Sequence, residues 1–231
     1  MDESLCTAMQ DGLEINETLS SLELNHCLCG ENPELWCRAL SFLRTNKALK
    51  SLMVTFDKDA TRSCFNALCR HIAAMLQDNA SLESLTIRKD GPWTSTIKII
   101  AEEYFSLVTT LQHNTTLKSL NLQGCGRLHV ITTLTHDEDK QMAAILKKNY
   151  ALESLTGIKL KNRGCDVGAI LRLNGVGRRY LVQDGSSISK GVEVLSAASN
   201  EINCVFLHLL ENPRLCDRRA VEVASDSIDN G

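Results

Sequence analysis

One pattern recurs five times along this chain and constrains its fold more than any other feature. It reads Asn, two residues, Leu, one residue, Ser-Leu, one residue and an aliphatic residue, and the fifth copy has an insertion near Gly157. The copies begin at Asn16, Asn46, Asn79, Asn114 and Asn149, in steps of 30, 33, 35 and 35 residues. A period of this length predicts a solenoid, in which each unit stacks only on its neighbours.

Each copy predicts a short strand, because its aliphatic residues alternate with a two-residue period at the end of the pattern. The inward positions are expected to be Leu22 and Leu24 in the first copy, Leu85 and Ile87 in the third, and Leu120 and Leu122 in the fourth. The residues between them are expected on the opposite face of the sheet.

Amphipathic stretches between the copies predict helices that cover one side of the sheet. Their apolar positions include Phe42 and Leu43, then Leu68, Cys69, Ile72 and Leu76, then Val108 and Leu111, and finally Met142, Ile145 and Leu146. Each helix is expected to end in Leu-x-x-Asn. The repeated Asn is interpreted as a helix terminator, because Asn tolerates the left-handed turn that stops a helix.

The run Leu-x-x-Leu-x-Leu, with Cys27 and Cys125 nine positions into two copies, resembles the leucine-rich repeat superfamily. Asp57 and Asp90 occupy the same position in two other copies and depart from the usual Asn or Cys. The resemblance is to the ribonuclease-inhibitor-like type, which also occurs in the sensor regions of NOD-like receptors. It covers about residues 5 to 165 and implies an α/β solenoid, with short parallel strands on a concave face and helices on a convex face.

The period is lost after Leu160, so the chain is divided into three parts. Residues 1–165 are predicted to form a solenoid of about five repeats. Residues 166–216 carry further helical patterns and are interpreted as a helical C-terminal cap, because the last hydrophobic face of a solenoid needs a cover. Residues 217–231 are expected to be a disordered tail, because charged and small polar residues dominate there.

Composition argues against several classes of function. The net charge is −3, which gives no reason to expect nucleic acid or an anionic membrane as a partner. No segment has the roughly 18 uninterrupted apolar residues of a membrane span, and the first residues do not resemble a secretory signal. Ten cysteines include no C-x-x-C pair, so a metal site is not expected. We expect an intracellular, cytoplasmic protein with no cofactor, no metal and no catalytic residues.

In a curved solenoid, the outward strand residues line the concave face, which is the usual binding surface. That surface is therefore the candidate site for an unknown protein partner, and the protein itself is expected to be a monomer. The face is small and polar and lacks the aromatic residues that often dominate binding, so loops are the alternative, with Trp93 as the best loop anchor. The candidate residues are Ser21, Glu23, Asn25, Ser51, Met53, Thr55, Ser84, Thr86, Arg88, Ser119, Asn121 and Gln123.

Two other functions are compatible with the sequence. The first is regulation of an enzyme, for example GTPase activation, in which Arg88 or Arg127 would contact a nucleotide-bound partner. The second is that the chain is a fragment of a larger NOD-like sensor. The main interpretation is a non-enzymatic protein–protein interaction scaffold.

Overall fold

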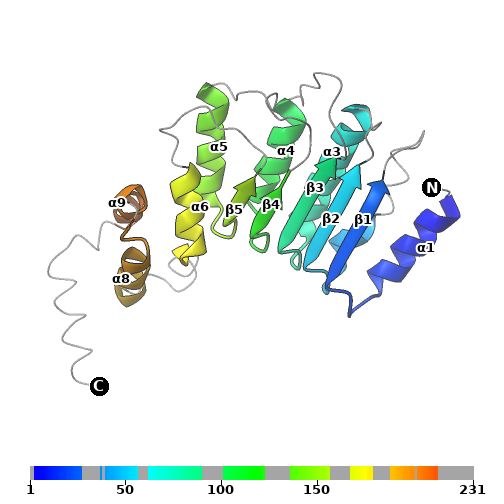
Figure 1. Ribbon diagram of the computed structural model, residues 1–231, viewed down its shortest axis with the longest axis horizontal. Coiled ribbons are helices and arrows are strands. Elements are labelled where there is room, and N and C mark those ends of the chain that lie inside the picture. The colour runs from blue at the N-terminus through cyan, green and yellow to red at the C-terminus, as the bar shows by residue number, and fades with distance from the viewer. Residues whose placement is uncertain are drawn as a thin grey trace. The chain divides into compact units, whose positions relative to one another are not determined.

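The structure is a computed structural model and describes residues 3–27, 37, 40–56, 62–89, 101–122, 136–156, 167–178, 188–200 and 202–212 (Figure 1). The chain divides into two compact units, Met1–Cys165 and Asp166–Gly231. Each unit is described by itself.

A parallel sheet of five strands forms one layer of the first unit. The strands lie in sequence order: β1 (Ser21–Cys27), β2 (Ser51–Phe56), β3 (Ser84–Lys89), β4 (Ser119–Asn121) and β5 (Ser154–Thr156). Equivalent residues of the repeat are paired, so the serine that opens each strand faces the serine that opens the next. The sequence period therefore sets the strand register directly.

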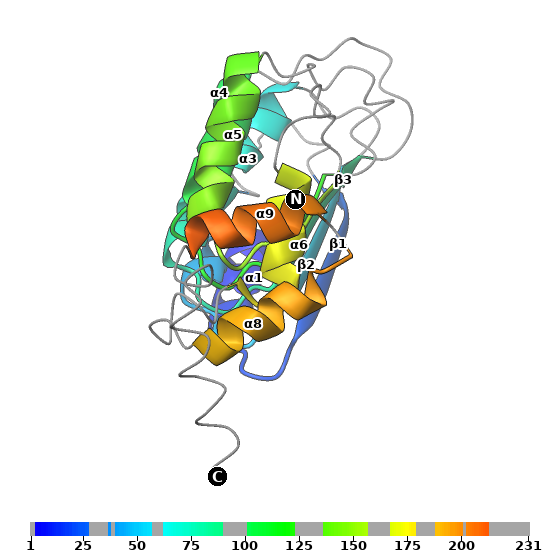
Figure 2. The same cartoon turned by 90° about the vertical axis from the view of Figure 1, so that its left-hand side faces the viewer.

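Helices form the second layer of this unit. They are α1 (Glu3–Glu14), the 3₁₀ helix η1 (Leu40–Arg44), α3 (Arg62–Asp78), α4 (Ala101–Leu111) and α5 (His136–Lys148). Each contacts the next one in this order. Figures 1 and 2 show α3, α4 and α5 side by side on one side of the sheet. The predicted α/β architecture, with parallel strands on one side and helices on the other, is confirmed.

The core lies between these two layers. Strand side chains alternate as predicted: Leu52, Val54, Leu85, Ile87, Leu120 and Leu122 are all 2% exposed or less. The predicted helix positions Phe42, Leu43, Leu68, Cys69, Ile72, Leu76, Val108, Leu111, Met142 and Leu146 are buried against them, whereas Ile145 is half-buried. Burial of large aliphatic side chains contributes about 1.5–3 kcal/mol each, so this row of leucines supplies most of the stability of the unit.

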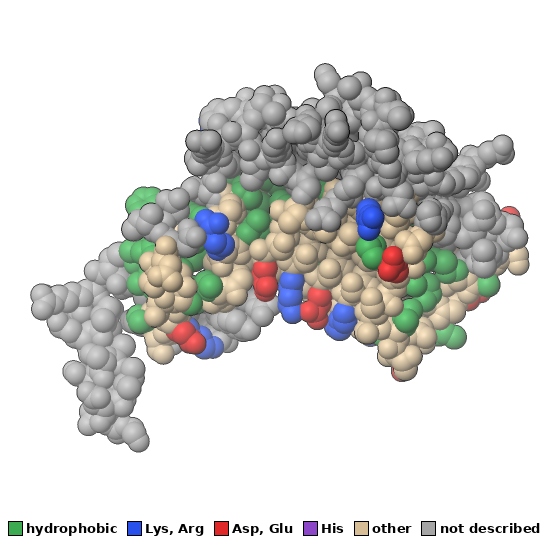
Figure 3. Space-filling view, in the orientation of Figure 1, with side chains coloured by type: hydrophobic (Ala, Val, Ile, Leu, Met, Phe, Trp, Pro, Cys, Tyr) green, Lys and Arg blue, Asp and Glu red, His purple; other side chains and the backbone are tan. Residues whose placement is uncertain are grey.

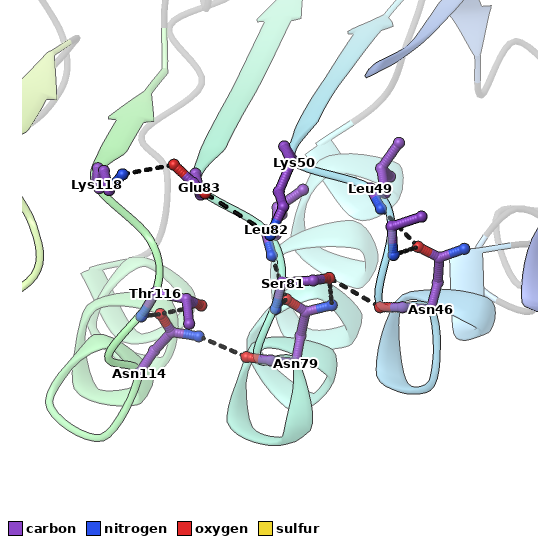
Figure 4. Close-up of polar contacts among 11 residues, drawn as sticks. Asn46, Leu49, Lys50, Asn79, Ser81, Leu82, Glu83, Asn114, Thr116 and Lys118 are labelled. Carbon is purple, nitrogen blue, oxygen red and sulfur yellow. Dashed lines mark hydrogen bonds and ion pairs between the residues drawn. The ribbon is translucent and has the colours of Figure 1, made fainter. Parts of the chain in front are cut away.

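The repeated asparagine joins neighbouring repeats (Figure 4). In Asn114, Oδ1 accepts hydrogen bonds from the amides of Thr116 (3.1 Å) and Leu117 (2.8 Å). Its Nδ2 donates to the carbonyls of Leu76 (2.8 Å) and Asn79 (3.1 Å) in the preceding repeat. The interpretation of this residue as a helix terminator was therefore incomplete. Its side chain forms the turn that leads into the next strand, and it also bonds two successive repeats together.

The other copies use the same geometry with small changes. Asn46 donates to the carbonyls of Leu13 and Asn16, and Asn149 donates to those of Leu111 and Asn114. In the third copy, Asn79 donates to the carbonyl of Leu43, and the hydroxyl of Ser81 donates to the carbonyl of Asn46 (2.8 Å). Asn46, Asn79, Asn114 and Asn149 are all buried. Buried amides with satisfied donors and acceptors tie the repeats together specifically.

Main-chain bonds link the turns that precede the strands. The carbonyl of Lys50 accepts from the amides of Glu83 (2.8 Å) and Ser84 (2.9 Å), and the carbonyl of Glu83 accepts from those of Lys118 (2.8 Å) and Ser119 (3.0 Å). The same arrangement recurs in the other repeats. Because these bonds involve only the backbone, side chains at these positions can vary.

The second unit is helical and contains α6 (Val167–Gly175), α8 (Ile188–Ala197) and α9 (Ile202–Glu211). Helix α9 contacts α6 and buries Cys204, Leu207 and His208 (Figure 2). Phe206 and Leu210, two large apolar residues of this helix, are each 62% exposed. Helix α9 is apolar around most of its circumference, so its periodicity did not identify the face that packs.

Candidate functional site: the open face of the sheet

The open face of the sheet consists of the strand side chains that point away from the helices. It corresponds to the concave face of the sequence prediction. Three columns of side chains run across the strands, and each column contains equivalent residues of successive repeats. Neighbouring parallel strands lie about 4.8 Å apart, so residues of one column are in reach of one partner surface.

The first column contains only serine. Its members are Ser21, Ser51, Ser84, Ser119 and Ser154, which the strand register places side by side. Ser21 is exposed and the other four are partly exposed. Serine side chains are short, so a partner can approach the backbone of the sheet closely along this column.

The second column is chemically mixed and lies beside the first. It contains Glu23, Met53, Thr86, Asn121 and Thr156. Two hydrogen bonds order its ends: Asn25 Nδ2 donates to Glu23 Oε1 (3.0 Å), and Thr156 Oγ1 donates to Asn121 Oδ1 (2.8 Å). The predicted residues of these two columns therefore do share one surface.

The third column differs from the prediction. Asn25 and Arg88 are exposed, but Thr55 is only 4% exposed and presents almost no surface to a partner. Thr55 pairs in register with Arg88 of β3, and on its other side the β1–β2 register shifts between Leu24 and Cys27. Gln123 lies outside the described residues, as do Trp93 and Arg127.

A row of alternating charges borders the open face where the strands begin, and sequence reasoning missed it. The residues that precede the strand serines are Lys50, Glu83, Lys118 and Glu153. Lys118 Nζ lies 2.6 Å from Glu83 Oε2, and Lys50 Nζ lies 3.7 Å from Glu83 Oε1. Acidic and basic side chains alternate along this border in Figure 3. The alternation was visible in the repeat, in the position between Leu and Ser.

The pKa of Glu83 is lowered from its ordinary value. The hydrogen bond from Lys118 is the largest cause, desolvation opposes it, and the charges of Lys118 and Lys50 lower the pKa further. All three side chains are more than a third exposed, so solvent screens these pairs. These exposed pairs therefore contribute little to stability.

Gly177 and Arg178 follow the C-terminal end of α6. Gly177 has a φ of 107°, which favours glycine. Arg178 is 2% exposed, and its Nε donates to Glu211 Oε2 (2.7 Å) while Nη1 donates to Asn174 Oδ1 (3.3 Å). The guanidinium is held by α6 and α9, so it is not presented to a ligand.

His208 is the other buried ionisable group of the second unit. Its Nε2 lies 3.0 Å from the carbonyl of Gly191, and its Nδ1 lies 3.4 Å from Asn212 Nδ2. Burial lowers the pKa of His208, and the positive charge of Arg178 lowers it further, against the carbonyl and Glu211. Because a carbonyl oxygen only accepts, Nε2 donates to Gly191, and the buried ring joins α8 and α9.

The part of the chain that the structure describes offers few other groups for catalysis or metal binding. Cys37, Cys64, Cys69 and Cys204 are buried, where a thiol packs as a small hydrophobic group. Among the described residues, no group of three His, Cys, Asp or Glu side chains could hold a metal ion. No helix within these ranges is long and apolar enough to cross a membrane.

Comparison with known proteins supports the fold. No protein-family model matches the sequence, and no characterised protein matches it in a sequence search. Solved structures do match. Leiomodin-1 actin-binding site 2 has a TM-score of 0.50 at 16% identity, over 78% of this chain and 93% of that one. The tropomodulin C-terminal domain of Caenorhabditis elegans has a TM-score of 0.51 at 14% identity, over 80% of this chain and all of that one.

These matches and the in-register repeats define the fold of the protein, which is an α/β repeat solenoid. The chain is similar in fold to the leiomodin and tropomodulin domains. At 14–16% identity, the likeness concerns the fold alone.

Proposed function

We propose that this protein is a non-enzymatic scaffold that binds a protein partner on the open face of the sheet. The observation that carries the proposal is the serine column, which five strands hold in register. A flat column of small polar side chains gives a partner access to a broad surface, and the neighbouring column supplies varied contacts. Solenoids commonly bind through such extended faces.

Charge and composition describe the kind of partner that fits. Met53 and Thr86 provide modest apolar contacts, Glu23 is paired with Met53, and Arg88 follows Thr86 two residues along β3. The open face has no described aromatic side chain to fill a deep pocket, so the affinity comes from many modest contacts. The partner is therefore a folded protein with an extended, mixed-polarity surface, bound inside the cell.

Actin is a specific candidate for that partner. The supporting observation is that one similar structure is an actin-binding site of leiomodin-1. The resemblance of the repeats to the ribonuclease-inhibitor-like type does not suggest a second candidate for the partner. The proposed role of residues 166–216 is to cap the last repeat.

Substitution of three serines tests the scaffold proposal. Ser51→Arg, Ser84→Arg and Ser119→Arg together place three bulky cations in the middle of the open face. The matched control carries Gln77→Arg, Ser106→Arg and Gln141→Arg, which are exposed positions on α3, α4 and α5. Both variants add the same charge, so only the location differs.

The measurement is affinity purification from the native cell with quantitative mass spectrometry, followed by co-sedimentation with purified actin. We expect partners that the wild type and the control retain to be lost with the serine variant. If the serine variant retains every partner, the binding surface lies elsewhere. If purified actin fails to bind the wild type, actin is excluded while the scaffold proposal stands.

Regulation of a GTPase is a second candidate, and the exposed position of Arg88 at the end of β3 favours it. An arginine placed on a bound nucleotide stabilises the transition state of phosphoryl transfer. Hydrolysis of GTP by a panel of GTPases should then accelerate with the wild type and not with Arg88→Ala. Intrinsic rates throughout the panel would exclude this role for those enzymes.

A part in a larger NOD-like sensor is a further proposal, tested by searching for a longer transcript.

A further inference from the structure

The row of charges that borders the open face lies directly beside the serine column. In order along the sheet, its members are Lys50, Glu83, Lys118 and Glu153, and each directly precedes a serine of the column. The side chains of Lys50, Glu83 and Lys118 are 50%, 38% and 39% exposed. Figure 3 shows basic and acidic side chains alternating along this border. A partner that covers the serines therefore also meets these charges.

The alternation of signs restricts the charges of a partner. Lys118 Nζ lies 2.6 Å from Glu83 Oε2, and Lys50 Nζ lies 3.7 Å from Glu83 Oε1, so the row is internally paired (Figure 4). A partner of uniform charge meets two attractive and two repulsive positions along the row. A partner whose charges alternate in the complementary order is attracted at all four positions, and it does not need to break the pairs within the row.

The spacing of the row selects the conformation of the partner segment. Equivalent residues of neighbouring strands lie about 4.8 Å apart. One turn of an α-helix advances about 5.4 Å, whereas side chains on one face of an extended chain are about 6.6 Å apart. By the fourth charge, a helix laid along the row is only about 2 Å out of step. An extended chain is by then about 5 Å out of step, which is a whole strand spacing and brings like charges together.

The serine column allows a helix to come close enough to use the row of charges. Its side chains are short and at least partly exposed, so a helix can approach the backbone of the sheet along the column. A helix with its side chains is about 10 Å wide. Over the serines, it reaches the row of charges on one side and the second column on the other. There it meets Met53 and Thr86, which lie two residues beyond Ser51 and Ser84.

We infer that the partner presents an amphipathic α-helix to the open face, which lies along the serine column with acidic and basic side chains alternating at one-turn intervals. Its acidic side chains face Lys50 and Lys118, and its basic side chains face Glu83 and Glu153. Small and apolar side chains of the helix cover the serines and Met53. This inference rests on the proposed function, because it describes the part of the partner that the open face binds.

The test uses a double variant that changes the order of the charges and keeps the composition. Glu83→Lys combined with Lys118→Glu gives two basic residues followed by two acidic ones along the row. The ion pair between positions 83 and 118 is kept with its signs reversed, and the net charge remains −3. Both side chains are more than a third exposed, so the variant should fold, which circular dichroism and urea unfolding check.

The probe is a displayed library of helical peptides. Four positions, one turn apart, are each glutamate or lysine, and the positions beside them vary among small and apolar residues. Selection against the wild-type chain should enrich peptides with alternating charges, and selection against the double variant should enrich peptides with two acidic and two basic residues in separate blocks. A matched library with a central proline, which interrupts the helix, should give no enrichment of either order.

Selected peptides are then measured against both proteins by fluorescence anisotropy. At low salt, an alternating peptide should bind the wild type roughly five- to thirtyfold more tightly than the double variant, because two of its four charge contacts become repulsive in the variant. High salt should remove most of this difference. Peptides with blocked charges should show the opposite preference.

Three results would overturn the inference. The first is that both selections enrich the same charge order, or none. The second is equal enrichment in the proline library, which would assign the surface to an extended segment. The third is a wild type that dimerises in sedimentation velocity and becomes monomeric with Lys118→Glu alone, which would assign the row of charges to a second copy. If charge order has no effect while the triple serine-to-arginine variant still loses its native partners, the inference fails and the proposed function stands.

Discussion

Replacement of Asn114 by alanine should destabilise the first unit far more than the same change at Asn16. Asn114 is buried and makes hydrogen bonds with four main-chain groups, two of them in the preceding repeat. Asn16 is half-buried and bonds only the two amides of its own turn. The contrast isolates the contribution of bonding between repeats.

The magnitude follows from the groups left without partners. A buried donor or acceptor that loses its hydrogen bond costs about 1–3 kcal/mol. Four groups are involved at Asn114, and local relaxation and water entry recover part of the loss, so we expect about 3–5 kcal/mol. At Asn16, two partly exposed amides give about 1 kcal/mol, as in the loss of a helix cap.

Urea unfolding followed by circular dichroism measures both changes against the wild type. The aspartate variant at position 114 adds a further check, because it keeps the acceptor, loses the amide donor and directs a negative charge at two carbonyls. It should be at least as destabilising as alanine near neutral pH and should recover as the pH falls and the carboxyl becomes protonated. Equal losses for Asn114→Ala and Asn16→Ala would refute the reasoning that the asparagines hold the repeats together.

Three further perturbations test other parts of the structure. Because burial lowers the pKa of His208, the folded chain favours the neutral ring: stability is fully present above about pH 6.5 and falls as the pH drops toward the lowered value. Urea titrations at several pH values should show this slope in the wild type and lose it in His208→Gln. Lys118→Glu should place a carboxylate beside Glu83 and cost about 0.5–1 kcal/mol at low salt, with most of the loss removed by high salt; a salt-independent loss would contradict the electrostatic cause. Leu120→Ala should cost about 3–5 kcal/mol and Leu22→Ala about 1–2 kcal/mol in thermal or urea unfolding, because only Leu120 is fully buried. Equal costs would contradict the reasoning from this difference in burial.

Periodicity made most of the first unit predictable from the sequence. The five serines could be aligned by eye, and parallel stacking converts an alignment of repeats into a register of strands. The same reasoning placed Leu85 and Leu120 inside and Thr86 and Asn121 outside. Local pattern and overall fold agree in these repeats, which is the condition under which sequence reasoning succeeds.

Contacts between residues that lie far apart in the sequence were harder to predict from it. The amide of Asn114 reaches the carbonyl of Leu76, 38 residues earlier, and nothing in the local sequence distinguishes that bond from a helix cap. The alternation placed Thr55 on the open face, but its side chain is buried, and the pattern within one strand does not reveal what covers a residue. On α9, apolar residues on nearly every side left Phe206 exposed and buried His208, whose partner Gly191 lies in another helix.

The paired main-chain bonds between successive turns have a consequence for how such a chain can change in length. Each repeat offers the next one the same carbonyls, whatever side chains and helices intervene, and the intervals of 30, 33 and 35 residues already differ. If residues 79–113 were excised, Asn114 would meet the carbonyls of Leu43 and Asn46, which Asn79 and Ser81 use now. The molecule is modular in this sense: it can lose or gain whole repeats through duplication or deletion, with every new junction a copy of one that already exists.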